Sequence, residues 1–105
     1  MLKILGQSKP GAGSTTTLYQ AGGGKSAVVS SLICCNTNAG VADSIVVYQV
    51  LAAGTPSASN TIFKANLAPD DSYVIIAGLA LAAGEKISVV STSGHVAFTA
   101  SGDES

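Results

Sequence analysis

A lysine and a serine follow three consecutive glycines, Gly22–Gly24, and this run has the chemistry of a phosphate-binding loop. In such loops glycine amides cradle the phosphates, the lysine reaches the β and γ phosphates, and the serine binds magnesium. The full pattern needs a further glycine five positions before Gly24, where this chain has Tyr19. It also needs a helix after Ser26, where a β-branched run begins instead. The spacing therefore favours a glycine-rich hairpin over a nucleotide site.

Two cysteines, Cys34 and Cys35, are adjacent inside a run that is typical of a β-strand. Neighbouring residues of a strand point to opposite faces, so these thiols cannot bind one metal ion together without distorting the backbone. A bond between them would be strained. We expect two small buried hydrophobic residues in a reducing compartment. Pairing with a cysteine of another chain is the alternative.

The chain has one histidine, His95, and six carboxylates, which is little material for general acid–base catalysis. A serine–histidine–aspartate triad would need a nucleophile elbow, and the sequence has none. The acidic pair Asp70-Asp71 follows Pro69, which is typical of a turn first and of a calcium site second. We therefore expect no enzyme activity, no cofactor and no metal.

The composition excludes several classes of protein. Only 10% of the 105 residues are charged, against about 25% in ordinary globular domains. The net charge of −1 gives no electrostatic basis for nucleic-acid binding. No apolar run approaches the roughly 18 residues of a membrane span, and the start of the chain lacks the apolar core of a signal peptide. We expect a protein made in the cytoplasm that binds neither nucleic acid nor membrane.

Short β-branched runs alternate with Gly, Pro, Asn and Asp turns, which predicts an all-β fold: an antiparallel β-sandwich, jelly-roll or Ig-like, of about eight short strands. Residues 1–13 are expected as an N-terminal arm or edge segment, and residues 14–105 as a single sandwich domain. The expected strands are Leu2–Leu5, Ser14–Gln20, Lys25–Asn36, Asp43–Ala52, Thr61–Leu67, Ser72–Ala77, Glu85–Thr92 and His95–Ala100.

The two longest expected strands, Lys25–Asn36 and Asp43–Ala52, are apolar on both faces. A strict alternation places Val28 with Leu32 on one face, and Val29 with Ile33 on the other. One face of a sandwich wall normally contacts water, so a flanking segment or a neighbouring subunit must cover the second face. The residues expected at this interface are Val29, Ile33, Val46, Val47, Tyr48 and Val50.

Several segments together resemble a family of small virion proteins from phages of cyanobacteria and other aquatic bacteria. They are Leu5–Ser8, Leu18-Tyr19, Gly24–Leu32, Cys35-Asn36, Gly78–Glu85, Val89, Phe98, Gly102 and Glu104. The chain departs from the family pattern at Ala21–Gly23, where relatives often carry Val-Pro, and at Thr37, where an arginine is common. The resemblance implies a β-sandwich structural component of the particle, a trimer by analogy, with no cofactor and no catalytic residues.

The leading hypothesis is a decoration, or cement, protein of the outer capsid of a tailed phage. Such a protein would contact itself, as a homotrimer, and the major capsid protein or tail proteins. The first alternative is a tail, baseplate or fibre accessory protein, which copy number would distinguish. The second is a surface carbohydrate-binding module, although the chain has only three tyrosines, two phenylalanines and no tryptophan with which to stack sugar rings.

Overall fold

The computed structural model describes residues 2–105, except for the side chains of residues 76 and 77. The described part contains eight strands and one short 3-10 helix. They are β1 (Lys3–Ser8), β2 (Thr16–Gln20), β3 (Ala27–Asn36), β4 (Asp43–Val50), η1 (Ala58–Asn60), β5 (Thr61–Leu67), β6 (Ser72–Leu81), β7 (Lys86–Ser91) and β8 (Val96–Glu104). No helix in this part of the chain is long and apolar enough to cross a membrane.

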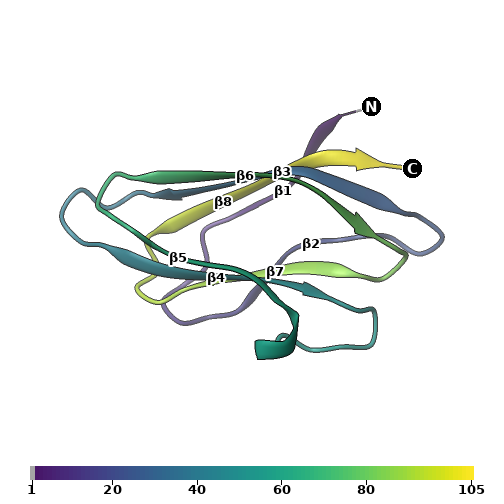
Figure 1. The fold of residues 1–105 in the computed structure, drawn as a ribbon, viewed down its shortest axis with the longest axis horizontal. Coiled ribbons are helices and arrows are strands. Elements are labelled where there is room, and N and C mark those ends of the chain that lie inside the picture. Colours follow the sequence, from purple (N-terminus) through teal and green to yellow (C-terminus); the bar gives the residue numbers. More distant parts are fainter. Residues whose placement is uncertain (1) are drawn as a thin grey trace.

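The strands form two four-stranded antiparallel sheets that pack as two layers (Figure 1). Sheet A has the order β1-β8-β3-β6, and sheet B has the order β2-β7-β4-β5. The first strand therefore pairs with the last, the second with the seventh, the third with the sixth and the fourth with the fifth. These four pairs alternate between the sheets, which is the connectivity of a jelly roll. The all-β sandwich prediction is confirmed, and the strand order selects the jelly roll over the Ig-like alternative.

The strand predictions hold in number and differ at some ends. The expected strand Thr61–Leu67 has the observed bounds of β5. The expected strand Ser72–Ala77 continues through Gly78 to Leu81 in the observed β6. Residues 3–8 of the expected N-terminal segment form β1, the edge strand that pairs with β8.

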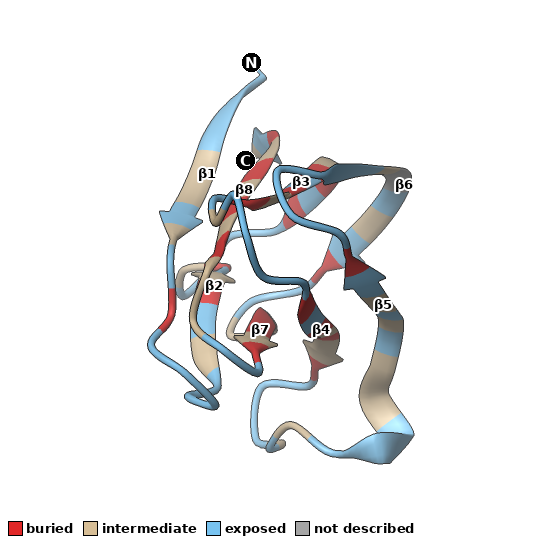
Figure 2. Ribbon diagram, turned by 90° about the vertical axis from the view of Figure 1, so that its left-hand side faces the viewer, coloured by how far each residue is buried: buried red, intermediate tan, exposed pale blue. Residues whose placement is uncertain are grey.

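The core lies between the sheets and receives large apolar side chains from strands of both. In Figure 2 buried residues alternate with intermediate or exposed ones along much of β3, β4 and β8. The largest fully buried apolar side chains are Phe98, Leu32, Ile45, Leu67, Leu81, Ile87, Val29, Val47, Val50, Val89 and Val96.

A β-bulge interrupts β3 at Ser30 and reverses its alternation. The register passes from Val29 opposite Gly102 to Ser31 opposite Ser101, so Ser30 is the extra residue. Its hydroxyl donates to the Ser101 carbonyl at 3.2 Å. Only a glycine avoids a clash at position 102, because a Cβ atom there would lie 1.9 Å from the Val28 carbonyl oxygen. Val29 and Leu32 consequently share the buried face, whereas strict alternation had separated them.

A buried polar cluster of Asn36 and Asp43 joins the turns at one end of the sandwich. The Asn36 amide donates to the carbonyls of Val41, Leu67 and Ala68 at 2.9, 3.2 and 3.2 Å. One Asp43 oxygen accepts the backbone N–H groups of Ser44 and Ser93, and the other accepts that of His95, at 2.8 to 3.0 Å. These bonds join the β3–β4, β5–β6 and β7–β8 connections to one another. Because each connection crosses between the sheets, the bonds also tie the two sheets together at this end.

Candidate functional site

The glycine-rich segment before Lys25 is a turn between β2 and β3. The backbone N–H of Lys25 donates to the Gly22 carbonyl at 3.1 Å, and Gly24 has a φ of 72°. The chain after Ser26 enters β3 and not a helix. The segment therefore lacks the strand-to-helix geometry of a phosphate-binding loop. The expected hairpin is wrong as well, because β2 belongs to sheet B and β3 to sheet A, so the turn crosses between the sheets and the two strands do not pair.

The two cysteines lie on opposite sides of β3. Cys34 is buried in the core, and burial raises the pKa of its thiol to about 12. Cys35 is partly exposed and points outward. Both thiols are free. Cys34 therefore behaves as a small hydrophobic residue, as expected, and only Cys35 can meet another chain.

His95 takes part in the structure through its backbone. Its N–H donates to Asp43, and its carbonyl accepts both the N–H and the hydroxyl of Thr37, at 2.8 and 2.7 Å. Among residues 2–105, no three His, Cys, Asp or Glu side chains lie close enough together to hold a metal ion.

Tyr19 and Glu104 form a contact between the two sheets on the side where β1 and β2 lie. The tyrosine hydroxyl donates to the Glu104 carboxylate. Burial, reinforced by this hydrogen bond, raises the pKa of Tyr19 to about 12, and the same bond lowers the pKa of Glu104. Gly6 of β1 lies against the Leu18 backbone here, since a Cβ atom at Gly6 would lie 2.1 Å from the Leu18 carbonyl oxygen. The sandwich is thus closed along β1 and β2.

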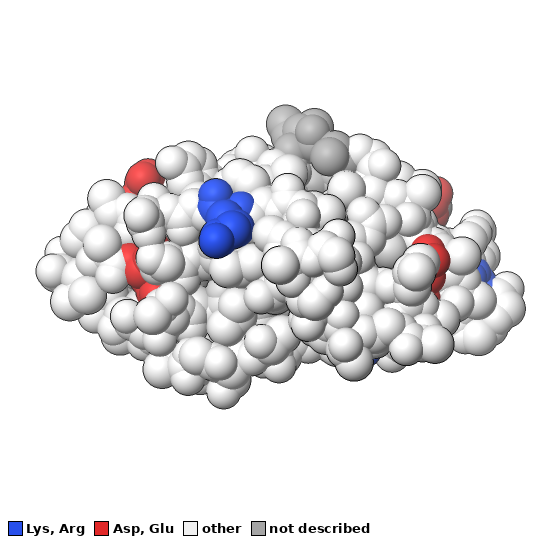
Figure 3. All heavy atoms as spheres, turned by 60° about the horizontal axis from the view of Figure 1, so that its bottom comes forward, with Lys and Arg blue, Asp and Glu red and all other residues white. Residues whose placement is uncertain are grey.

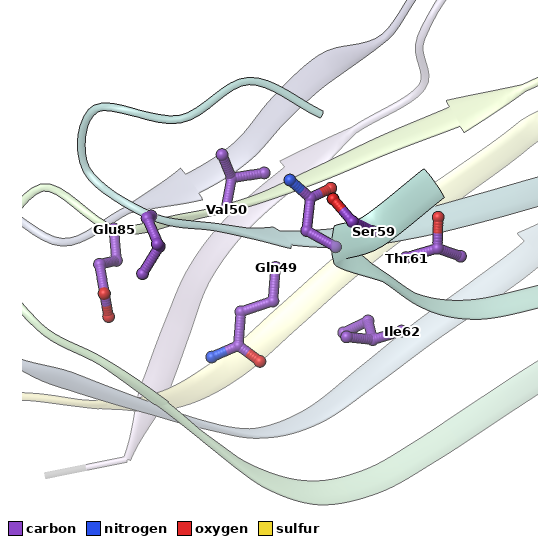
Figure 4. Close-up of a pocket in the computed structure, with 8 residues that line it drawn as sticks. Gln49, Val50, Ser59, Thr61, Ile62 and Glu85 are labelled. Carbon is purple, nitrogen blue, oxygen red and sulfur yellow. The ribbon is translucent and has the colours of Figure 1, made fainter. Parts of the chain in front are cut away.

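A hollow of about 290 Å³ lies between the end of β4, the η1 region and the β6–β7 turn (Figure 4). Its polar side chains are already used by the fold. The Gln49 amide donates to the Ala80 carbonyl at 2.9 Å, and Glu85 accepts the Ala82 N–H at 2.8 Å. Asn60 donates to the Thr55 carbonyl and accepts the Ser57 N–H. These groups fasten loops, so the hollow does not have the convergent free polar groups of a ligand site.

The outward side of sheet A, which we call the A face, is unusually apolar. The register and alternation place on it Ile4, Gln7, Val28, Ser31, Ile33, Cys35, Ser72, Val74, Ala80, Ala97, Thr99, Ser101 and Asp103. Asp103 is the only charged residue among them. Four large side chains of this face are exposed, namely Ile4 (60%), Val28 (44%), Ile33 (39%) and Val74 (57%). No described segment of the chain covers them.

The outward side of sheet B, which we call the B face, is more polar and partly covered by the chain itself. Its positions are Thr17, Gln20, Ser44, Val46, Tyr48, Val50, Thr61, Ile62, Lys64, Asn66, Lys86, Ser88 and Val90. Val46, Tyr48 and Val90 are half-buried. Figure 3 views the side of the molecule on which sheet B lies and shows few, scattered charged side chains. A shallow hollow there is lined by Val46, Lys64 and Asn66, among others.

Val50 shows how sheet B covers its own apolar surface. It is only 1% exposed, yet it lies outside the main core cluster. The turn after β4 packs on it, because a Cβ atom at Gly54 would lie 3.3 Å from a Val50 methyl carbon. This turn is a flanking segment of the kind expected to cover the second apolar face of β4.

The structure separates the six residues expected at an interface. Val29 and Val47 are in the core and Val50 is under its loop, so none of the three presents a free surface. Val29 was misplaced because the sequence does not show the bulge at Ser30. Ile33 lies on the A face, and Val46 and Tyr48 lie on the B face. Sequence reasoning missed Ile4, Val28 and Val74, although each is a large apolar residue in an expected strand.

Comparison with known proteins gives a similarity of structure and none of sequence. No protein-family profile matches the chain, and no curated protein matches its sequence. A chain in the structure of infectious bursal disease virus Gx strain is similar in fold, with a TM-score of 0.44 and 14% sequence identity. The match covers 99% of this chain and 30% of that chain, so this chain spans less than a third of its length.

Proposed function

We propose that the chain is a structural protein of a virus particle, most specifically a decoration protein of the outer capsid of a tailed phage. The observation that carries the proposal is the A face. It exposes Ile4, Val28, Ile33 and Val74 with one carboxylate among its outward positions. The antiparallel sheets of a sandwich normally expose a polar side to water. A face of this kind is suited to permanent contact with other protein subunits.

The architecture agrees with such a role. Jelly rolls occur in viral capsid domains and also in lectins and cupins, so the fold alone does not decide function. Of these settings we propose the capsid, which is the one that the resemblance of several segments to small phage virion proteins implies; no family profile and no curated sequence matches the chain. Exposed aromatic rings, which sugar-binding sites use for stacking, are scarce: Phe98 is buried, and Tyr73 is the aromatic residue with a largely exposed side chain among those described. The A face therefore favours protein contact over sugar binding.

The contact that we propose is made by small and medium apolar side chains. Burial of apolar area contributes about 25 cal/mol per Å², from which association and ordering costs are subtracted. The valines, serines, threonines and alanines of the A face lose little rotamer entropy on docking. A subunit repeated many times over a capsid can therefore hold neighbouring capsomers by modest contacts of this kind.

Quantitative mass spectrometry of purified particles from the source of the sequence tests the proposal. A decoration protein is expected in hundreds of copies per particle, and a tail or fibre accessory protein in a few to dozens. Absence of the chain from the particles would contradict the virion role altogether.

A pair of variants tests the face itself. Ile33→Lys places a charge on the A face, whereas Val46→Lys places one on the B face beside Lys64. We expect Ile33→Lys to reduce incorporation into particles at least about tenfold, since a buried unpaired charge is costly, and Val46→Lys to leave it within about twofold. Circular dichroism confirms that both variants are folded. Equal incorporation of both would contradict the A face as the docking surface.

A further inference from the structure

The two lateral sides of the sandwich are built differently. On one side β1 and β2 lie together, and Gly6 contacts the Leu18 backbone. On the other side lie the edge strands β5 and β6 (Figure 2). The contact there is made by the rings of Phe63 and Tyr73, whose centroids are 6.0 Å apart in an edge-to-face arrangement. This second side is the open side of the sandwich.

The two edge strands of the open side differ in how well they resist pairing with another strand. Natural edge strands are protected by lysines, prolines, bulges or shortness. β5 carries Lys64 near its middle and a register irregularity opposite Tyr48. β6 is ten residues long and contains no charged residue and no proline. Its irregularity opposite Ser30 lies in its second half, so its first five residues, 72–76, pair with β3 without interruption.

We propose that β6 is a self-association edge, at which two copies of the chain pair antiparallel about a two-fold axis and join their A sheets into one sheet. Among the described residues β6 pairs with β3 alone, so the backbone N–H and C=O groups of its other side have no strand partner there. The Ala80 carbonyl of β6 accepts a hydrogen bond from the Gln49 side chain. Another β-strand satisfies these groups directly.

Two observations favour a second copy as that strand. An uncharged strand paired with itself brings no like charges into opposition, and the same surface serves both subunits, as a two-fold interface requires. Val74 is 57% exposed and Tyr73 42% exposed at this edge, so each copy supplies apolar side chains to both faces of the new strand pair.

The size of the contact sets its strength. A strand of ten residues is about 33 Å long at about 3.3 Å per residue and covers a strip roughly 10 Å wide, or about 330 Å² per copy. This is well below the about 800 Å² per partner of a standard interface. The pairing is therefore reversible, with a dissociation constant in the micromolar range or weaker, and becomes stronger where copies are concentrated. A two-fold pairing gives two chains, not the three that the sequence resemblance implies.

Sedimentation equilibrium over about 1 µM to 1 mM tests this inference with two matched variants. Val74→Lys charges the β6 edge, and Ile4→Lys charges the opposite edge of the same sheet at a residue of similar exposure, 60% against 57%. The unaltered chain and Ile4→Lys are expected to approach twice the mass of 10.3 kDa as concentration rises. Val74→Lys is expected to stay at the mass of one chain, or to dimerise at least tenfold more weakly.

Amide hydrogen exchange identifies the contact independently of any variant. Amides within Ser72–Leu81 should become slower to exchange as concentration rises, while those of β1 and β5 stay unchanged. A single-chain mass up to 1 mM, a three-chain mass, or equal weakening by both lysines would each overturn the inference. None of these results bears on copy number in particles, so the virion proposal stands or falls separately.

Discussion

The A face and the B face are both outward sides of antiparallel sheets, but the chain treats their apolar residues differently. On sheet B the turn at Gly54 closes over Val50, and Val46 and Tyr48 remain half-buried beside Lys64. On sheet A no described segment covers Val28, Ile33 or Val74. The chain covers the apolar outward residues of sheet B itself, and for those of sheet A we propose that other subunits provide the cover.

The difference between the two faces requires that Val29 of β3 lies in the core and Val28 lies outside it. A pair of lysine variants tests this assignment with the largest expected effect. Val29→Lys buries an unpaired charge in the core and is expected to cost at least about 4 kcal/mol of unfolding free energy, a large part of a typical 5–15 kcal/mol. Val28→Lys lies on the A face opposite Asp103 and is expected to change stability by less than about 1 kcal/mol. Urea denaturation followed by circular dichroism measures both. A larger loss for Val28→Lys than for Val29→Lys would mean that the bulge at Ser30 is absent.

The two faces keep fixed positions because the polar cluster of Asn36 and Asp43 joins the sheets at one end. Asp43→Ala removes the acceptor of three backbone N–H groups and is expected to destabilise the fold by about 3 kcal/mol. Ser44→Ala is the control, because it removes a neighbouring hydroxyl on the exposed B face, and it is expected to cost less than about 1 kcal/mol. Thermal unfolding measures the two. A neutral Asp43→Ala would show that the turns hold without the carboxylate.

Cys34 and Cys35 give a test of the same inside–outside assignment without a change of sequence. Burial raises the pKa of Cys34 to about 12, so at pH 8 its thiolate is scarce as well as inaccessible. Cys35 is expected to react with a thiol reagent at least about 100-fold faster than Cys34 in the folded protein, with both reacting alike in denaturant. Peptide mass spectrometry of the labelled chain distinguishes them. Faster labelling of Cys34 than of Cys35 would mean that the inward and outward sides of β3 are assigned the wrong way round.

The same thiol gives a smaller effect of pH. The folded state holds Cys34 neutral, whereas in the unfolded state it ionises near its ordinary pKa of 9.0. Above about pH 9 the unfolded state has therefore lost the thiol proton that the folded state still holds. The free energy of unfolding is expected to fall as pH rises through this range. Cys34→Ala should reduce this dependence. Unfolding midpoints from pH 7 to 10 measure it, and an identical slope in both proteins would exclude Cys34 as the cause.

Much of the fold could be predicted from the sequence, because the eight strands are marked by β-branched runs and turn residues. β6 was expected to end near Ala77 because Gly78 reads as a turn, yet pairing with β3 carries the strand to Leu81. The choice between jelly-roll and Ig-like order depends on pairs such as β1 with β8, which are distant in the sequence. No local pattern encodes such pairs.

The candidate site was harder to predict than the fold. The sequence showed that β3 and β4 have apolar residues on both sides, but a single extra residue, Ser30, exchanged the roles of Val28 and Val29. The loop over Val50 and the exposure of Val74 are likewise tertiary facts. Asn36 and Asp43 were expected only as the last and the first residues of two strands. Their inward positions on β3 and β4 are what indicates a buried cluster.

Hydroxyl-radical footprinting of the chain, free and bound in purified particles, shows whether the A face is the docking surface, because it reports the exposure of single side chains. We expect oxidation of Ile4, Val28, Ile33 and Val74 to fall strongly on binding, while Tyr48 and Ile62 of the B face are oxidised as in the free protein. Protection of Tyr48 and Ile62 with an unprotected A face would contradict it.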